Sequence, residues 1–212
     1  MSLGDARLYL VAGARLKAGA TADLVPELAG AGVDVLQLRE KDMDGAVLLH
    51  AAQSLALSCR SVGIPFFVND RPDVAHLAGA SGVHLGQDDL PVAAARRISQ
   101  EALVGWSTHS REQIDAVLQW DWPPDYIAVG PVYETPTKPG RPATGLDTIR
   151  YAAKTVPAEL PWFAIGGIDR RNLPEVLEAG ARRIVVVRAI ADAADPGTAA
   201  AELRATLDLA PL

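Results

Sequence analysis

Eight short apolar segments recur along the chain at intervals of about twenty to thirty residues, and most are separated by Ala/Leu-rich stretches with helical spacing. They are LYLVA from Leu8, VDVLQLR from Val33, PFFVN from Pro65, GVHLG from Gly82, ALVGWS from Ala102, DYIAVG from Asp125, PWFAIGG from Pro161 and RIVVVRAI from Arg183. Strands that alternate with helices pair in parallel. We therefore predict an α/β fold, a single (β/α)₈ TIM barrel over residues 1–212, with an open doubly wound sheet as the alternative.

The composition narrows the class of protein. The chain has 212 residues, of which 49% are apolar, so it can bury a sizeable core. Its formal charge of −6 argues against nucleic-acid and membrane-surface partners, which need clustered positive charge. No apolar run approaches the roughly 18 residues of a membrane span, and the first residues lack a secretory pattern, so we expect a cytoplasmic location. The lone Cys59 excludes an internal disulfide and is expected to be a buried apolar residue.

One predicted strand ends in polar residues at every second position. In VDVLQLREKD, period-two alternation places Gln37, Arg39 and Lys41 on one face of the strand and Leu36, Leu38 and Glu40 on the other. An amide and two cations on one face of an otherwise apolar strand indicate a polar ligand.

Most of the other predicted strands also end in polar or glycine-rich sequence: VNDRPD, GQDD, STHS, GPVYETPTKPG, IGGI and VVVRAI. Any one of these is equally consistent with an ordinary polar loop. In a TIM barrel, however, the site is built from the carboxyl ends of the strands and the loops that follow them. The shared position therefore predicts one common site at that end.

Two aspartates follow consecutive predicted strands. Asp70 comes directly after PFFVN and Asp89 shortly after GVHLG, so that both carboxylates would lie at one rim. Carboxylates without a nearby His or Cys suit Mg²⁺. Alternatively, Asp70 caps the following helix, and Asp88 competes with Asp89 as a ligand. His84 and His109 are more typical of hydrogen-bonded structural residues.

A second group of residues is cationic and rich in glycine. The segment TPTKPGR contains Thr135, Thr137, Lys138 and Arg141, and IGG offers backbone N–H groups that no side chain shields. Loops after the seventh and eighth strands of these barrels often bind phosphate. The sequence thus predicts two anion sites at one end of the barrel, one metal-assisted and one metal-free.

The ordered motifs QLREK, VNDR, HLGQDD, GWSTHS, GPVYETPTKPG, AIGGI and VVVRAI resemble the thiamine-phosphate synthase family across essentially the whole chain. This resemblance implies a TIM-barrel transferase that joins a pyrimidine methyl pyrophosphate to a thiazole ethyl phosphate and releases pyrophosphate with Mg²⁺. The implied partners are small-molecule substrates.

The resemblance also implies roles for individual residues. Asp70 and Asp89 become the Mg²⁺ ligands, and Arg39, Lys41, Ser107 and Lys138 become the catalytic residues. The implied substrate-binding residues are Gln37, Leu38, Arg39, Glu40, Lys41, Asn69, Ser107, Thr135, Pro136, Thr137, Lys138, Gly167, Val187 and Arg188. Arg188 departs from the serine that is frequent there, so its guanidinium either grips the phosphate or turns away.

The family reaction is thought to be largely dissociative: pyrophosphate leaves, the aminopyrimidine stabilises the cation and the thiazole nitrogen attacks. It needs no enzymic nucleophile, in agreement with the absence of a Ser or Cys triad pattern. Two alternatives remain open. One is a related thiazole tautomerase that uses His109 for proton transfer, and the other is a non-catalytic barrel that binds a phosphate ligand.

Overall fold

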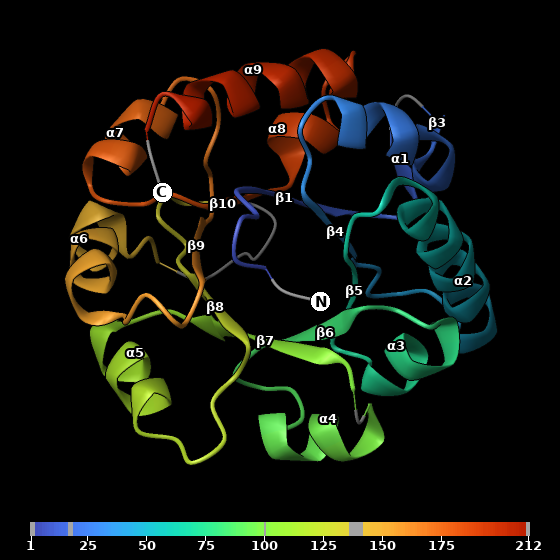
Figure 1. The fold of residues 1–212 in the computed structure, drawn as a ribbon, viewed down its shortest axis with the longest axis horizontal. Helices are drawn as coiled ribbons and strands as arrows, with labels where there is room; N and C mark the ends of the chain where they lie inside the picture. Colours follow the sequence, from blue (N-terminus) through green and yellow to red (C-terminus); the bar gives the residue numbers. More distant parts are fainter. Residues whose placement is uncertain (1–2, 17–18, 100, 136–141, 211–212) are drawn as a thin grey trace.

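The computed structural model describes residues 3–16, 19–99, 101–135 and 142–210. Within these ranges, eight parallel strands close into a barrel, which confirms the predicted (β/α)₈ fold and excludes the open sheet (Figure 1). In barrel order they are β1 (Leu8–Ala12), β10 (Ile184–Val186), β9 (Trp162–Ile165), β8 (Tyr126–Val129), β7 (Leu103–Thr108), β6 (Gly82–Leu85), β5 (Phe66–Asn69) and β4 (Val35–Leu38).

The helices form a ring outside the strands (Figure 1). They are α1 (Thr21–Gly30), α2 (Gly45–Val62), α3 (Pro72–Ala78), α4 (Val92–Ile98), α5 (Arg111–Leu118), α6 (Gly145–Thr155), α7 (Leu173–Glu178), α8 (Arg188–Ala191) and α9 (Pro196–Asp208). A short antiparallel pair, β2 (Arg15–Leu16) and β3 (Gly19–Ala20), precedes α1. None of the helices in the described ranges is both long and apolar enough to cross a membrane.

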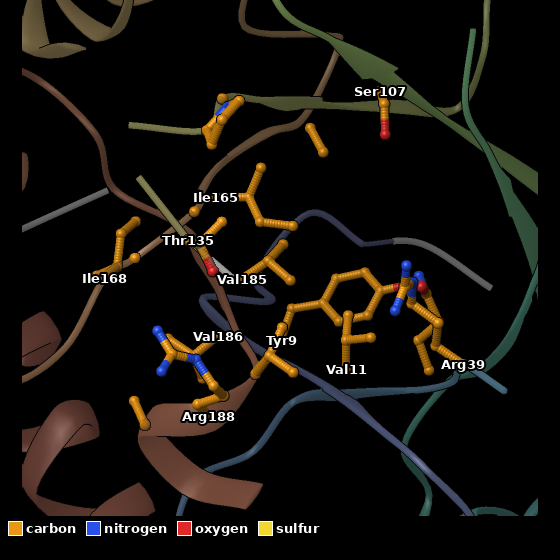
Figure 2. Close-up of a pocket in the computed structure, with 18 of the residues that line it drawn as sticks. Tyr9, Val11, Arg39, Ser107, Thr135, Ile165, Ile168, Val185, Val186 and Arg188 are labelled. Carbon is orange, nitrogen blue, oxygen red and sulfur yellow. The ribbon is translucent and has the colours of Figure 1, made fainter. Parts of the chain in front are cut away.

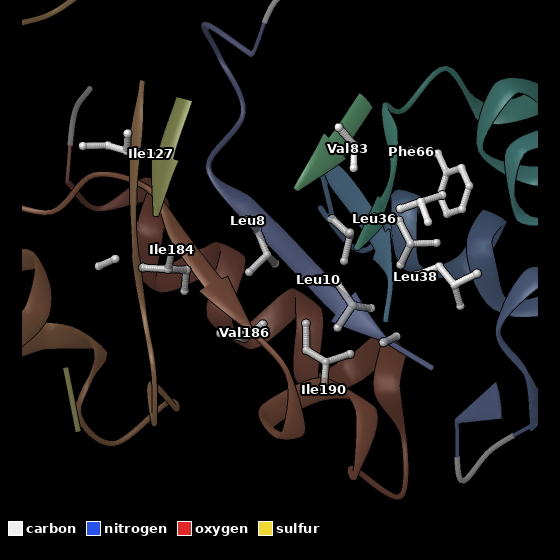
Figure 3. Packing of buried hydrophobic residues seen from close by; sticks show 14 of the residues in the cluster. Leu8, Leu10, Leu36, Leu38, Phe66, Val83, Ile127, Ile184, Val186 and Ile190 are labelled. Carbon is white, nitrogen blue, oxygen red and sulfur yellow. The ribbon is translucent and has the colours of Figure 1, made fainter. Parts of the chain in front are cut away.

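The outer core lies between the sheet and the helices. Successive strand residues point to opposite faces, so Leu8 and Leu10 of β1 pack outward with Leu36 and Leu38 of β4 (Figure 3). The α2 helix contributes Cys59, which is buried as expected. Burial raises the pKa of its thiol to about 12, so the thiol stays protonated at neutral pH.

The inner core fills the barrel itself. Four aromatic rings, Tyr9, Phe67, Tyr126 and Phe163, meet there with centroid separations of 5.5–5.9 Å. Strands β6 and β7 carry glycine opposite these rings. A Cβ at Gly105 would overlap the Tyr126 ring, and one at Gly82 would overlap Phe67. The glycines therefore make room for a layer of rings across the barrel.

Two element boundaries are set by identifiable residues. Helix α5 follows Ser110, whose side chain accepts the backbone N–H of Gln113 as an N-cap. The last apolar segment, RIVVVRAI, is a strand only as far as Val186, because α8 begins at Arg188.

Candidate functional site

A cavity of about 360 Å³ opens at the carboxyl end of the barrel strands. Its lining includes eight residues that the sequence proposed for a ligand: Gln37, Arg39, Asn69, Ser107, Thr135, Gly167, Val187 and Arg188. In Figure 2, Arg39 and Arg188 lie on opposite sides of it, with the Tyr9 ring between them. The cavity thus has a cation at each side, as two separate anion sites require.

Arg39 is held at the cavity wall just beyond β4. Its backbone N–H donates to the carbonyl of Ala12 at 2.8 Å, which continues the ladder between β1 and β4 by one residue. Its Nη2 atom is buried and has no hydrogen-bond partner among the described residues. An unpaired buried guanidinium nitrogen is costly unless a ligand supplies an acceptor.

The alternation that places Gln37 and Arg39 inside does not continue to Lys41. Strand β4 ends at Leu38, and Lys41 is exposed, lining a separate surface depression with Glu40 and Asp44. The expectation that Lys41 shares the inner face is therefore wrong, because period-two alternation holds only while the strand continues.

The side chains of Leu38 and Glu40 also turn away from the cavity. Leu38 packs in the outer core, and a Glu40 carboxylate oxygen accepts the backbone N–H of Ala14 at 2.7 Å. A ligand at this wall would therefore meet the side chains of Gln37 and Arg39 rather than those of their neighbours.

The opposite side of the cavity is formed by the loops after β9 and β10. Gly166 and Gly167 both have positive φ, at 104° and 68°. A Cβ on Gly167 would lie 2.7 Å from Cβ of Tyr133, so this close approach of two loops requires glycine. Val187 and Arg188 complete this side. Pro136, Thr137 and Lys138 lie outside the described residues.

Asp70 and Asp89 lie at the rim formed by β5 and β6. The Asp70 N–H donates to the carbonyl of His84 at 2.8 Å, and the Asp89 carboxylate accepts the N–H of Gly86 at 2.7 Å. Asp70 has φ of 63°, a left-handed conformation that Asp tolerates better than most residues. The N-cap of α3 is Arg71, without a side-chain capping bond, so the alternative that Asp70 caps this helix is wrong.

The donor set at this rim is compatible with Mg²⁺. Within the described ranges, no three or more His, Cys, Asp or Glu side chains are grouped to hold a metal. Mg²⁺ does not need such a group, because it keeps several waters and is often bound through one or two carboxylates plus substrate phosphates. Asp88 lines a neighbouring depression with His109, and the assignment of Asp89 as the second carboxylate stays a prediction.

A chain of hydrogen bonds runs beneath the cavity, and its central members were not predicted from the sequence. Gln37 Nε2 donates to the Tyr9 hydroxyl at 2.8 Å, and this hydroxyl lies 2.9 Å from that of Tyr126. Tyr126 lies 2.9 Å from His84 Nδ1, whose Nε2 lies 2.9 Å from Ser107 Oγ. His84 was expected to be a hydrogen-bonded structural residue, which these bonds confirm, whereas the sequence signals Tyr9 and Tyr126 only as hydroxyl-bearing residues within apolar strands.

His109 also lines the cavity, where the sequence offered it either a structural role or, in a tautomerase, proton transfer. Its Nδ1 lies 2.5 Å from the carbonyl of Gly130, and its backbone N–H donates to the Gln113 side chain at 2.7 Å. These bonds hold the ring against the loop that follows β8. The arrangement agrees with the structural role but leaves the ring within reach of a ligand.

The sequence and the fold were compared with known proteins. The family model for thiamine monophosphate synthase matches residues 8–190. A thiamine-phosphate synthase of Acidothermus cellulolyticus is 54% identical over 97% of this chain and 97% of its own. One from Thermus thermophilus is 53% identical over 95% of this chain and 97% of its own.

Solved structures agree with this result. Thiamine phosphate pyrophosphorylase from Pyrococcus furiosus superimposes with a TM-score of 0.86 at 31% identity, over 96% of both chains. A 3-hexulose-6-phosphate synthase has a TM-score of 0.62 at 22% identity, which shows a shared barrel fold alone. The chain therefore belongs to the thiamine-phosphate synthase family of transferases.

Proposed function

We propose that the protein joins 4-amino-2-methyl-5-(diphosphooxymethyl)pyrimidine to 4-methyl-5-(2-phosphoethyl)thiazole, forming thiamine phosphate and releasing pyrophosphate. The observation that carries this proposal is the buried Nη2 of Arg39, which lacks a partner among the described residues at the cavity wall. An anionic ligand group would satisfy it with a charge-assisted hydrogen bond. Arg188, on the other side, offers a second cation for a second anionic substrate.

The leaving pyrophosphate belongs, on this proposal, beside Arg39 and the rim of Asp70 and Asp89. These two carboxylates would hold Mg²⁺, which when bound offsets the charge that develops on the departing pyrophosphate. Arg39 donates to the same group from the cavity wall. Lys138 and Lys41 are proposed to add further positive charge, although Lys41 lies outside the cavity in this structure.

The thiazole phosphate belongs, on this proposal, at the glycine-rich side. Backbone N–H groups near Gly167, Val187 and Thr135 would bind its oxygens, because glycine leaves the backbone open to close approach. Pro136 and Thr137 are proposed to complete this site. Asn69 and Ser107 line the cavity between the two ends, where the pyrimidine ring would lie.

The reaction needs little from the protein beyond position and charge. The bond between the pyrimidine CH₂ carbon and the pyrophosphate oxygen breaks, and its electron pair leaves with pyrophosphate. The thiazole nitrogen then donates its lone pair to that carbon, so that no proton is transferred in this step. Holding both substrates in line, with the leaving charge neutralised, accounts for catalysis.

Product analysis tests the proposal directly. The purified protein is mixed with both substrates and Mg²⁺, and thiamine phosphate and pyrophosphate are quantified together. We expect equal amounts of both products, each dependent on both substrates. A mixture that releases no pyrophosphate would overturn the proposal, whereas full activity in excess chelator would overturn only the metal assignment.

Thiazole tautomerisation is a second candidate because His109 lines the cavity. A tautomerase would act on the thiazole phosphate alone and would need a group that transfers a proton. His109→Asn separates the two functions: a synthase should keep most of its rate, whereas a tautomerase should lose it. The non-catalytic alternative predicts substrate binding without either product.

A further inference from the structure

We propose that Tyr9, Tyr126 and His84 are positioning residues, which fix the direction of one hydrogen-bond chain so that Gln37 offers its carbonyl oxygen, and Ser107 its hydroxyl proton, to the ligand. This inference rests on the proposed function for its kinetic test. It assigns a role to the floor of the cavity, whose residues do not themselves need to touch the reacting atoms.

The direction follows from counting protons along the chain. The Gln37 amide nitrogen donates to Tyr9, so the single proton of the Tyr9 hydroxyl is directed to Tyr126. The proton of Tyr126 is then directed to Nδ1 of His84. A neutral imidazole with an acceptor at Nδ1 carries its proton at Nε2, and this N–H donates to Ser107 Oγ.

The two ends of the chain therefore carry opposite polarity toward the cavity. Gln37 lines the cavity, and its carbonyl oxygen accepts no hydrogen bond from the described residues. The hydroxyl proton of Ser107 is left over, because its oxygen already accepts from His84. The site therefore favours a ligand with a hydrogen-bond donor near Gln37 and an acceptor near Ser107. An aminopyrimidine meets both requirements when its amino group donates to Gln37 and a ring nitrogen accepts from Ser107.

The surroundings hold the chain in place. Tyr9 and Tyr126 are fully buried, and Phe163 packs edge-on against both rings at 5.5 and 5.6 Å. Burial raises the pKa of both phenols well above the ordinary value, so both hydroxyls keep their protons at neutral pH. Gly105 leaves the space that Tyr126 occupies. Reversing the chain would require every one of its links to turn together.

The positioning role can be tested by comparing kcat/KM for the pyrimidine substrate and for its 4-oxo analogue. The 4-oxo analogue of the pyrimidine substrate replaces the amino donor with an acceptor, which would oppose the carbonyl of Gln37. We expect the wild-type protein to prefer the amino substrate by about 100-fold or more in kcat/KM. Tyr9→Phe and Tyr126→Phe keep the rings but break the chain, and each should lower this preference about tenfold. The KM for the thiazole phosphate should stay within about twofold.

Two controls separate positioning from general damage. Tyr151→Phe removes a hydroxyl that donates to Asp115 on the outer surface, and it should leave the preference unchanged. The double variant Tyr9→Phe/Tyr126→Phe should lose no more preference than either single variant, because all three break the same chain. Unchanged preference in both single variants, or fully additive losses, would overturn the proposal.

A measurement on the wild-type protein does not depend on either variant folding. Nitrogen-15 NMR of the four histidines reports which ring nitrogen carries the proton. His84, assigned by loss of its signal in His84→Asn, should carry the proton at Nε2. A proton at Nδ1 would overturn the proposed direction, even if pyrophosphate release failed and the proposed function itself were wrong.

Discussion

Asp34 and Arg204 form an ion pair that joins the amino-terminal end of the barrel to α9. Arg204 Nη1 lies 2.9 Å from Asp34 Oδ1 and 3.0 Å from Oδ2. Asp34 Oδ2 also accepts the backbone N–H groups of Arg7 and Leu8, at 2.7 and 2.9 Å. One carboxylate thus ties the start of β1 to the last helix, at the end of the barrel opposite the cavity.

Removing this carboxylate should destabilise the fold without changing catalysis. We expect Asp34→Ala to lower the free energy of unfolding by about 1–3 kcal/mol, because two backbone N–H groups lose their acceptor. Asp34→Asn should lose less, since its amide oxygen can still accept. Urea unfolding measures the effect, and kcat of the folded variant should match the wild type. Equal stability of all three proteins would show that water replaces the carboxylate without cost.

Arg39 should contribute to the reaction through its guanidinium. Arg39→Ala removes the buried donor, and we expect kcat to fall by about 100-fold or more, as for loss of a preorganised donor to a developing anion. Arg150→Ala is the matched control, because Arg150 is exposed and, among the described residues, pairs with Asp147 one turn away. Steady-state kinetics with both substrates measure kcat and KM for the two variants. A rise in KM at constant kcat would show that Arg39 binds the ground state and the transition state equally.

Asp70→Asn tests the metal assignment with little disturbance of the backbone, because Asn also tolerates the left-handed conformation at this position. We expect the rate to fall about 100-fold at saturating substrates, together with weaker Mg²⁺ activation. Titration of the rate with Mg²⁺ measures both effects. An unchanged Mg²⁺ requirement would assign the metal to other residues.

Arg188→Ser tests whether the Arg188 guanidinium binds the phosphate or turns away from it. The guanidinium lines the cavity, and the described residues form no ion pair with it. We therefore expect the KM for the thiazole phosphate to rise about tenfold, with little change for the pyrimidine. Arg170→Ala is the control, since Arg170 pairs with Glu202 on the surface. A thiazole KM that stays constant would show that only the backbone at this position matters.

Gly105→Ala should destabilise the barrel, because the added Cβ overlaps the Tyr126 ring. We expect a loss of about 1–3 kcal/mol, typical of overpacking. Gly45→Ala provides the contrast: nothing lies near its Cβ at the start of α2, so the same change should raise stability by about 0.5–1 kcal/mol. Thermal unfolding of both variants checks the opposite signs. A neutral Gly105→Ala would mean that the aromatic layer can shift.

The sequence predicted those features that depend on local pattern. The eight strands follow from short apolar segments, and the cavity lining at Gln37 and Arg39 follows from period-two alternation. The prediction that Lys41 lies on the same face was wrong because the alternation holds only as far as β4 continues. The side-chain pattern does not reveal that the strand ends at Leu38.

Other features depend on contacts between distant strands. Tyr9 and Tyr126 are separated by 117 residues, and their hydroxyls meet only because the barrel closes between β1 and β10. The role of Gly105 depends likewise on a ring from a neighbouring strand. Residue spacing within one segment does not predict such contacts between segments. The seven ordered motifs, in contrast, are sufficient to identify the family.

The layer of four rings inside the barrel gives the cavity a floor as well as walls. Tyr9, Phe67, Tyr126 and Phe163 are each fully buried, so solvent does not reach this layer of rings. On the proposed mechanism, water would reach a short-lived cation at the pyrimidine CH₂ through the open mouth of the cavity. The fraction of substrate lost to the hydrolysed alcohol would then measure how well the incoming thiazole blocks this mouth.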